Sequence, residues 1–534
     1  MKKLLIACLI LAMILTTSVS ALASEPTVDW LTKGQPDGWT EADATETLDF
    51  HTSSACYTLD NFTVSGGDTT YVMSQLVFDI LIDRDSTTGE YIPWLAESYD
   101  LAADGSTLTF KLREDAWFTD GTQLTADDAI FSFARLKDDT EHIPDSNAKA
   151  VRQYVESIEK IDEFSFAIHF STPNPEFIYF LTSFPILCEH AYNEMGYEAY
   201  FANPVGSGPY VVKNFDSANG EGSFTIRTDE HGWWGYDAYG SYTNVKDVNV
   251  KYAPEATTRL SSLRVGEADI VNGVPTMDAA PLEAEGYQID VQPAVTYIFL
   301  QFACDENSLF YNRDLREAVS LCIDREAIVA ALLSGYGYAA TTNAMPGDLG
   351  YRDDIAYEYD VQKAKDLVAQ SGYDGRTIKF IYTTSTVDIA TELAQAIQSM
   401  CLSIGLNVEV VPLEVAVYDD TRNAREYDMC IASIIKSGNM WFKTAAEVVG
   451  ADRFNTGHTN QALKDLGAEV GVTMDQEKLD ALLKEMAGIE LTEFEPNAYL
   501  YFPTLLFAQT PALTDILWHN QHRPDFKFAK LGVE

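Results

Sequence analysis

An Asp-Gly pair followed by a strictly alternating run is the feature that most narrows the possible folds of this chain. Asp104-Gly105 supplies the positive φ that a tight hairpin turn needs. After it, the apolar Leu108, Phe110 and Leu112 alternate with polar side chains, a period of two that puts them on one face of a sheet. The sequence therefore predicts a hairpin whose second strand is half buried.

A second Asp-Gly pair, at residues 120–121, leads into a predicted amphipathic helix. Thr125 precedes Ala126-Asp127-Asp128, so a hydroxyl can cap the helix start and the acidic side chains meet its positive end. Apolar residues then recur at helical spacing, at Ala129, Ile130, Phe133 and Leu136. Residues 164–170 alternate again and predict another strand.

The order of motifs in residues 91–138 resembles one known family. The phrases P-x-LAES, DGSTLTFKLRE and W-F-TDGTQLTADDAIFSFARL are similar to the signature region of the family-5 extracytoplasmic solute-binding proteins. These are the peptide- and oligopeptide-binding receptors of bacterial ABC importers. The resemblance implies a two-lobed α/β periplasmic-binding-protein fold of type II, the large cluster with an extra subdomain. Mixed sheets flanked by helices and a hinge between the lobes are then expected.

Three later stretches carry the same resemblance. Residues 203–210, NPVGSGPY, resemble P-V-G-T-G-P-Y, and residues 312–329 and 359–373 follow two further family motifs. The glycines of the first stretch suit a tight turn where chain segments approach closely, and a strand rather than a helix follows it, so a phosphate cradle is not indicated. Arg316 and Asp324 are assigned scaffold roles, because charges on such helices are usually solvated or paired.

Local patterns complete the expected layout. The apolar spacing of residues 70–82 predicts a helix. Residues 378–382, 390–404 and 408–411 read as strand, helix and strand, an order that implies a right-handed α/β crossover. The aromatic cluster at residues 233–239 is expected to pack inside the first lobe rather than to stack on a ligand.

The length of the chain and the resemblance together predict the domain organisation. At 534 residues the chain exceeds what a single core usually holds, which suggests two or more lobes. The expected parts are a signal peptide (1–23), a first segment of lobe I (24–77), an outer subdomain of lobe I (78–195), a second segment of lobe I (196–295), lobe II (296–505) and a C-terminal return to lobe I (506–534).

The N-terminus has the pattern of a cleaved export signal. Lys2-Lys3, the apolar run 4–15 and Ala21-Leu22-Ala23 form a charged region, a hydrophobic region and a cleavage site before Ser24. The run of about 12 apolar residues is short for the roughly 20 that span a bilayer. An extracytoplasmic protein, periplasmic or associated with the cell envelope, is therefore expected. Cys8 precedes most of the hydrophobic run, so lipoprotein anchoring is not expected.

Charge and cysteine content exclude several partners. Without the signal, 34 basic residues (36 less Lys2 and Lys3) face 81 acidic ones, a net charge near −47, which argues against nucleic acid or an anionic lipid surface as partner. Six cysteines remain, and no two form a C-x-x-C pair. Most are expected to be buried thiols, although export permits disulfides, and their pairing stays open.

The sequence contains no recognisable catalytic motif. H-E-x-x-H, G-x-S-x-G and G-x-G-x-x-G after a strand are all absent. His519 and His522 have a spacing that could present two metal ligands, but Pro524 follows closely and a metal there is not expected. No catalytic residue, metal or cofactor is predicted, so the chain is expected not to be an enzyme, with a secreted hydrolase as a remote alternative.

The region expected to determine the ligand departs from the family pattern. Residues 426–433 match the family's strand, after which peptide receptors show G-W-x-A-D-Y, whose aspartate holds the α-ammonium of the peptide. By simple count Ser437 or Asn439 takes that place here. A buried ammonium without the carboxylate would lose roughly 1.5 to 3 kcal/mol. Three alternatives stay open: a neutral ligand, an extended binding mode, or another acid such as Glu447.

These arguments lead to a set of candidate ligand-binding residues and a function. The candidates are Ser65, Ser437, Gly438, Asn439, Met440, Trp441 and Tyr501. The resemblance implies a monomeric receptor that captures a small peptide or a similar solute in an interlobe cleft and delivers it to the membrane permease of an ABC transporter. A receptor of the same fold for a sugar, an opine or a metal chelate is the main alternative. A surface sensor or chaperone that keeps the fold without feeding a permease is another.

Overall fold

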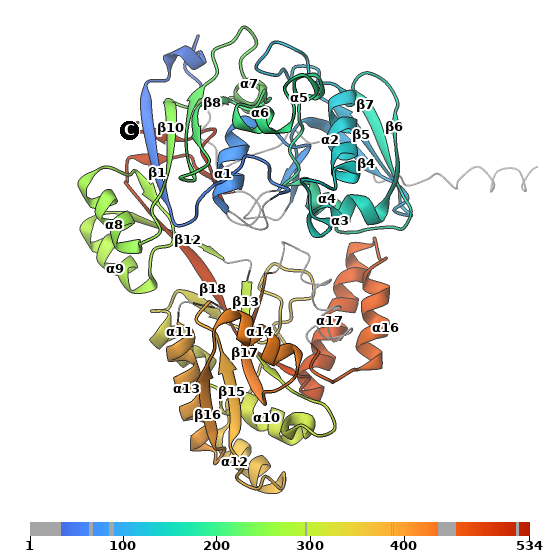
Figure 1. Cartoon of the computed structure of the whole chain (residues 1–534), viewed down its shortest axis with the longest axis vertical. Helices are drawn as coiled ribbons and strands as arrows, with labels where there is room; N and C mark the ends of the chain where they lie inside the picture. Colours follow the sequence, from blue (N-terminus) through green and yellow to red (C-terminus); the bar gives the residue numbers. More distant parts are fainter. Residues whose placement is uncertain are drawn as a thin grey trace, which may run out of the picture.

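Strand β18, Asn497–Gln509, connects the two lobes in the computed structural model, because it pairs with strands of both (Figure 1). Its first part pairs with β13, Thr296–Phe302, and β14, Gly337–Ala339. Its last part pairs with β12, Gln288–Pro293, and β11, Ile270–Val271. We call the upper lobe of Figure 1, built around β1, lobe I and the lower one, built around β13, lobe II. The structure describes residues 34–63, 68–84, 90–293, 296–385, 387, 389–435, 455–518 and 523–533.

The sheet of lobe I runs in the order β18-β11-β1-β10-β9-β8. β1, Glu46–Thr52, lies parallel to β10, Val245–Tyr252, and to β11, whereas β9, Glu221–Ile226, and β8, Tyr210–Asp216, continue the sheet in antiparallel fashion. The helices α1, Asp68–Val77, α8, Ala256–Val265, and α9, Thr276–Glu285, pack against strands of this sheet, and α7, Trp234–Tyr239, contributes aromatic side chains to the buried cluster of this lobe. Leu48 and Phe50 of β1 are buried, as their alternation predicts.

The outer subdomain has a sheet of its own, in the order β4-β5-β7-β6. Its strands are β4, Ala96–Leu101, β5, Thr107–Leu112, β6, Val155–Lys160, and β7, Ser165–Phe170, and its helices are α2, Ala126–Asp138, α3, Asp145–Tyr154, α4, Phe177–Leu181, α5, Glu189–Met195, and α6, Tyr197–Ala202. The predicted hairpin turn is confirmed, because Gly105 has a φ of 68° and the three apolar side chains of β5 are fully buried. The predicted start of α2 is confirmed too, with Asp128 accepting a 2.9 Å hydrogen bond from the backbone N–H of Thr125.

The helix predicted over residues 70–82 is wrong at its C-terminal end. α1 ends at Val77, whose carbonyl accepts a 2.8 Å hydrogen bond from the backbone N–H of Gly208. A Cβ on Gly206 would lie 2.0 Å from the same carbonyl oxygen, so only glycine permits this approach. The chain then extends into β2, Ile82–Arg84, which pairs with β3, Tyr91–Pro93. The structural role predicted for the glycines of residues 203–210 is thereby explained.

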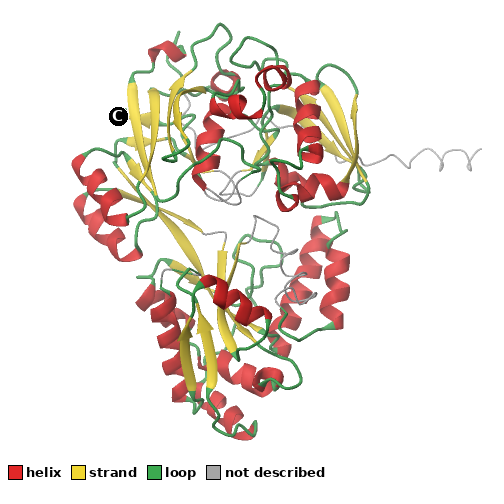
Figure 2. Cartoon of the chain, in the orientation of Figure 1, coloured by secondary structure: helices red, strands yellow, loops and turns green. Residues whose placement is uncertain are grey.

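Lobe II contains the predicted α/β crossover. β15, Ile378–Tyr382, lies parallel to β16, Val408–Pro412, and to β17, Met429–Ile435, which in turn pairs with β13. Helices cover both faces of this sheet (Figure 2). They are α10, Arg313–Cys322, α11, Arg325–Leu332, α12, Val361–Gln370, α13, Ala390–Ser403, α14, Val415–Asn423, α16, Gln461–Val470, and α17, Gln476–Glu493.

The scaffold roles assigned to Arg316 and Asp324 agree with their contacts. Arg316 is buried and donates to the backbone carbonyls of Phe310 and Phe494, and Asp324 caps α11 by accepting from the N–H of Ala327.

The short remaining elements that the structure describes are η1, Glu41–Asp43, η2, Leu309–Tyr311, β19, Leu513–Thr514, β20, Leu517–Trp518, β21, Pro524–Asp525, and β22, Lys530–Leu531.

The six cysteines after the predicted signal are buried free thiols, as the sequence analysis expects for most of them. Separate buried apolar clusters fill the two lobes, one of them running from residue 44 to 270 and resuming at 507–529. Among the helices that the structure describes, none combines the length and apolarity needed to cross a bilayer. The residue boundaries of the domains stay a prediction.

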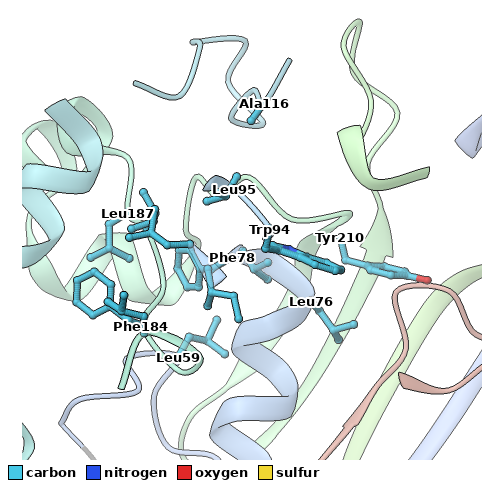
Figure 3. Close-up of a cluster of buried hydrophobic side chains, with 14 of the residues drawn as sticks. Leu59, Leu76, Phe78, Trp94, Leu95, Ala116, Phe184, Leu187 and Tyr210 are labelled. Carbon is cyan, nitrogen blue, oxygen red and sulfur yellow. The ribbon is translucent and has the colours of Figure 1, made fainter. Parts of the chain in front are cut away.

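A fully buried carboxylate, Asp79, lies at the centre of lobe I. It accepts hydrogen bonds from the indole N–H groups of Trp94, Trp233 and Trp234, at 2.9, 3.0 and 3.1 Å. Figure 3 shows part of the buried apolar cluster to which Trp94 belongs, with Tyr210 and Phe78 labelled beside it. The predicted packing role of the tryptophans is confirmed, but their shared acceptor was not foreseen, since it lies more than 150 residues away from two of them.

The C-terminal segment completes this centre. The ammonium of Lys527 lies 3.5 Å from Asp79 and 3.2 Å from Asp525, and both carboxylates and the lysine are buried. Burial alone would lower the pKa of Lys527, but Asp525 and Asp79 outweigh that effect and raise it. The lysine is therefore charged. The C-terminal segment that carries it must return to lobe I for Asp79 to be neutralised.

Replacing Asp79 by alanine leaves three buried indole donors without their acceptor and Lys527 with one carboxylate fewer. We expect the free energy of unfolding to fall by about 3 to 5 kcal/mol, the usual cost of breaking a buried ion pair. Chemical denaturation measures this change. Asp237→Ala, at an exposed position of α7, is the control and should stay within about 0.5 kcal/mol of the parent protein. A loss below about 1 kcal/mol for Asp79→Ala would contradict the role of this carboxylate.

Candidate functional site

The direction of β18 determines which strand ends meet between the lobes. β18 runs from lobe II into lobe I, and β11 is antiparallel to it, so β11 and its parallel neighbours β1 and β10 run toward lobe II. In lobe II, β13 is antiparallel to both β18 and β17, so β17 and its parallel partner β15 run toward lobe I. The carboxyl ends of both parallel sets therefore point at the opposite lobe, and such ends are where open α/β sheets bind ligands.

A network of hydroxyl and amide groups occupies the strand ends of lobe I. Thr69 of α1 shares hydrogen bonds with the hydroxyls of Thr52 and Ser54, at 2.8 and 2.7 Å. Asn272, just after β11, accepts from the N–H of Ser53 at 2.8 Å and donates to Thr52 at 3.2 Å. These contacts fix the ends of β1 and β11 relative to α1. Thr52 and Thr69 are buried within the network, whereas Ser54 and Asn272 are partly exposed and are neutral polar groups that suit the polar parts of a small solute.

Two cationic side chains support this network. The buried Arg259 donates to four backbone carbonyls at the ends of β10 and β11, those of Ala253, Pro254, Asn272 and Gly273. Burial lowers its pKa. Arg523 donates from Nε to Asp68 at 2.9 Å, and its guanidinium lies 3.8 Å from the ring centre of Tyr71. The C-terminal segment is thereby held against the first turns of α1.

Six of the seven candidate ligand-binding residues lie outside the described residues. They are Ser65, Ser437, Gly438, Asn439, Met440 and Trp441, and the alternative acid Glu447 lies outside as well. The last described residue before positions 437–441 is Ile435, at the carboxyl end of β17 and opposite Thr296. Tyr501 is described: it lies in β18 opposite Ile298, fully buried in the core of lobe II.

Sequence reasoning missed the lobe I network. Thr52, Ser53 and Asn272 each end or follow a strand that the sequence analysis did not recognise as parallel to its neighbour. Polar residues directly after apolar strands were the signal that could have found them. The two histidines considered as metal ligands, His519 and His522, lie outside the described residues.

The lobes also touch on the side of the outer subdomain. The loop between α16 and α17 brings Met474 against the Asp104-Gly105 turn, where a Cβ on Gly105 would lie 2.9 Å from Cγ of Met474 and 2.9 Å from Cβ of Pro173. Figure 1 shows this helix pair on the right of lobe II, below the outer subdomain. The lobes are therefore joined at β18 and also touch at this turn.

A buried acid in lobe II has a perturbed pKa. Burial raises the pKa of Glu490 in α17 to about 8; the hydrogen bond from the Tyr499 hydroxyl, 3.1 Å long, opposes this shift and nearby Glu495 adds to it. Glu495 in turn accepts from the amide of Asn460 at 2.8 Å and lies 2.8 Å from Nε2 of His458. Burial thus favours the protonated form of Glu490, which joins α17 to β18 through Tyr499.

Comparison with known proteins agrees with this architecture. The model of the family described as "Bacterial extracellular solute-binding proteins, family 5 Middle" matches residues 90–441. The chain belongs to this family. Among curated members of the family-5 solute-binding proteins, the heme-binding protein A of Haemophilus influenzae is 25% identical over 456 residues, which cover 80% of this chain and 79% of that protein.

Two solved structures show how far the fold of this solute-binding family extends along the chain. HbpA2 from Haemophilus parasuis superposes with a TM-score of 0.79 at 20% identity, covering 91% of this chain and all of its own. DppA from Helicobacter pylori, an ABC transporter-associated periplasmic binding protein in complex with the peptide STSA, gives 0.70 at 22% identity, covering 92% of this chain and 99% of its own. The predicted two-lobed α/β fold is confirmed.

The contact of Met474 with the Asp104-Gly105 turn predicts a measurable effect on lobe closure. Met474→Asp places a charge against Gly105 and Pro173 and removes apolar contact, so the closed arrangement should lose about 1 kcal/mol, roughly fivefold in the ratio of closed to open molecules. Small-angle X-ray scattering should report a larger radius of gyration. Met277→Asp, on an exposed position of α9, is the matched control. An unchanged scattering curve for Met474→Asp would show that this contact does not stabilise the closed arrangement.

The raised pKa of Glu490 predicts a pH dependence of stability. The folded state holds this proton more tightly than the unfolded state, so the free energy of unfolding should fall as the pH rises from about 4.5 to about 8. Glu490→Gln removes this contribution, and the variant should become more stable relative to the parent protein across that range. Denaturation at several pH values measures the difference. Glu493→Gln, exposed on the same helix, should leave the pH profile of the parent unchanged.

Proposed function

We propose that this protein is the solute receptor of an ABC importer, which captures a peptide-like solute between its lobes and delivers it to the membrane permease. One observation carries the proposal. In this chain of the family-5 solute-binding proteins, the ends of parallel strands from two lobes face each other, and the lobes are joined through β18 and the β12–β13 connection. A hinge of this kind lets two walls close over a solute without covalent chemistry.

Peptide is the ligand class that the relatives support first. DppA from Helicobacter pylori, which shares this fold, is in complex with a peptide. The partly exposed hydroxyl of Ser54 and amide of Asn272 can hydrogen-bond the polar backbone of such a ligand, and the buried Thr52 holds both in place. Export by a signal over residues 1–23 and a monomeric state belong to the same proposal.

A non-peptide ligand is the second candidate, and one observation favours it. Ser437 or Asn439 stands where peptide receptors of the family carry the aspartate that holds the α-ammonium. The relative from Haemophilus influenzae is named as a heme-binding protein. A receptor for a sugar, an opine or a metal chelate would use the same two lobes without needing that carboxylate.

Native mass spectrometry of the freshly purified protein separates these candidates. The added mass of a co-purified solute is measured first, and the solute is then released and identified. A short peptide would support the first candidate, and a sugar, opine, heme or metal chelate would replace it with the second. Conversion of a peptide by the purified protein, abolished by a change at Thr52 or Asn272, would contradict a binding function altogether.

Trp441 is the aromatic residue that we expect to contact the solute from lobe II. If its ring packs on the ligand, Trp441→Ala should weaken binding by more than about 1 kcal/mol, about fivefold in Kd, in calorimetric titration with the solute identified above. Tyr311→Ala is the control, because Tyr311 is exposed in η2 of the same lobe, beyond the end of β13 that points away from lobe I. Unchanged affinity in Trp441→Ala would exclude this residue from the site.

A further inference from the structure

Three side chains that bind metals meet in the outer subdomain, apart from the strand ends described above. Asp120 lies in the turn before α2, Cys188 directly precedes α5, and His190 lies in the first turn of α5. Oδ2 of Asp120 lies 3.6 Å from Nδ1 of His190, and the same nitrogen lies 3.6 Å from Sγ of Cys188. All three donor atoms lie within 4.8 Å of one another.

These separations are those of ligands around one small cation. With Zn–S near 2.3 Å and Zn–N and Zn–O near 2.1 Å, tetrahedral angles place sulfur and nitrogen roughly 3.6 Å apart and nitrogen and oxygen roughly 3.4 Å apart. Both expected values agree with the observed distances from Nδ1 of His190 to Sγ of Cys188 and to Oδ2 of Asp120 to within about 0.2 Å. Two of the three donor pairs therefore already have the spacing of a metal site, and the third pair, Asp120 and Cys188, lies within 4.8 Å.

Neighbouring groups hold the donors in this arrangement. The backbone N–H and the hydroxyl of Thr122 both donate to Oδ1 of Asp120, at 2.9 and 2.7 Å, which directs Oδ2 toward His190. The backbone N–H of Cys188 donates to the hydroxyl of Tyr200 at 3.1 Å, which fixes the start of α5. Hydrogen bonds of this kind, made by the ligand residues to groups outside the donor set, orient metal ligands in proteins.

The surroundings suit a partly solvated cation. The side chain of Cys188 is buried, whereas those of Asp120 and His190 are 24% and 56% exposed, so one side of the donor set is closed and the other open to water. Asp128, whose Oδ1 accepts from the N–H of Glu189 at 3.0 Å, adds negative charge nearby. Burial raises the pKa of the Cys188 thiol to about 11, so binding a cation would release a proton.

We propose that Asp120, Cys188 and His190 bind a transition-metal dication, with Zn²⁺ as the representative ion, independently of the transported solute. A thiolate and an imidazole select such ions over Mg²⁺ and Ca²⁺, which prefer oxygen ligands. One thiolate and one carboxylate neutralise the dication, and water completes a four-coordinate site. The bound ion joins the turn at residues 119–122 to α5 and so stabilises the outer subdomain rather than the ligand site.

Titration of the purified, metal-free protein with Co²⁺ at mildly alkaline pH tests the proposal. A bound thiolate gives an intense sulfur-to-cobalt charge-transfer absorption in the near ultraviolet, which should saturate at one equivalent and disappear when Zn²⁺ is added. Cys188→Ser should abolish this absorption. Asp120→Asn and His190→Gln change exposed side chains that leave the core intact, and each should weaken Co²⁺ binding by roughly ten- to a hundredfold.

The matched control is His169→Gln, because His169 forms a histidine–carboxylate pair with Glu159 in the same subdomain. It should bind Co²⁺ as the parent protein does. Zn²⁺ should raise the midpoint temperature of thermal unfolding by a few degrees in the parent and in this control only. Absence of the charge-transfer absorption in the parent would overturn the proposal. So would its persistence in Cys188→Ser, or parent-like affinity in both Asp120→Asn and His190→Gln.

Discussion

The hydrogen bonds from three indoles to Asp79 are the interaction on which lobe I depends. A carboxylate with no solvent exposure loses its hydration, a cost of several kcal/mol that only complete pairing offsets. Trp94, Trp233, Trp234 and Lys527 supply that pairing from three distant parts of the chain. The outer subdomain, the main sheet of lobe I and the C-terminal segment must therefore be in place together for Asp79 to be fully paired.

The two lobes are connected through paired strands. β18 is continuous through both lobes, and β12 and β13 are consecutive strands that pair with its two halves. Pro293 pairs with Thr504, and Pro503 pairs with Gly337, so prolines lie in both strands where the sheet passes from one lobe to the other. Proline cannot donate a ladder hydrogen bond, so the sheet is weakest at this level and bending there costs little.

Local chemistry allowed much of the fold to be predicted, and long-range contacts explain the rest. The turn at Gly105 and the alternation of β5 depend on neighbouring residues and could be predicted. The helix from residue 70 was extended too far because Val77 is capped by Gly208, more than a hundred residues away. The lobe I network at Thr52 and Asn272 was missed for a related reason: polar residues after each strand were visible in the sequence, but the pairing that brings them together joins positions 220 residues apart. The Asp120–Cys188–His190 cluster joins positions about 70 residues apart and follows no motif.

The outer subdomain links these observations to closure. Its hairpin turn is the part of lobe I that meets Met474, and the same subdomain is joined to the main sheet through Trp94 and Asp79. The turn at Gly105 is therefore connected to the strand ends of lobe I through a packed, hydrogen-bonded core. Lobe II contacts lobe I both at β18 and at Gly105, so these two contacts together hold the opposed strand ends at their separation in this arrangement of the lobes.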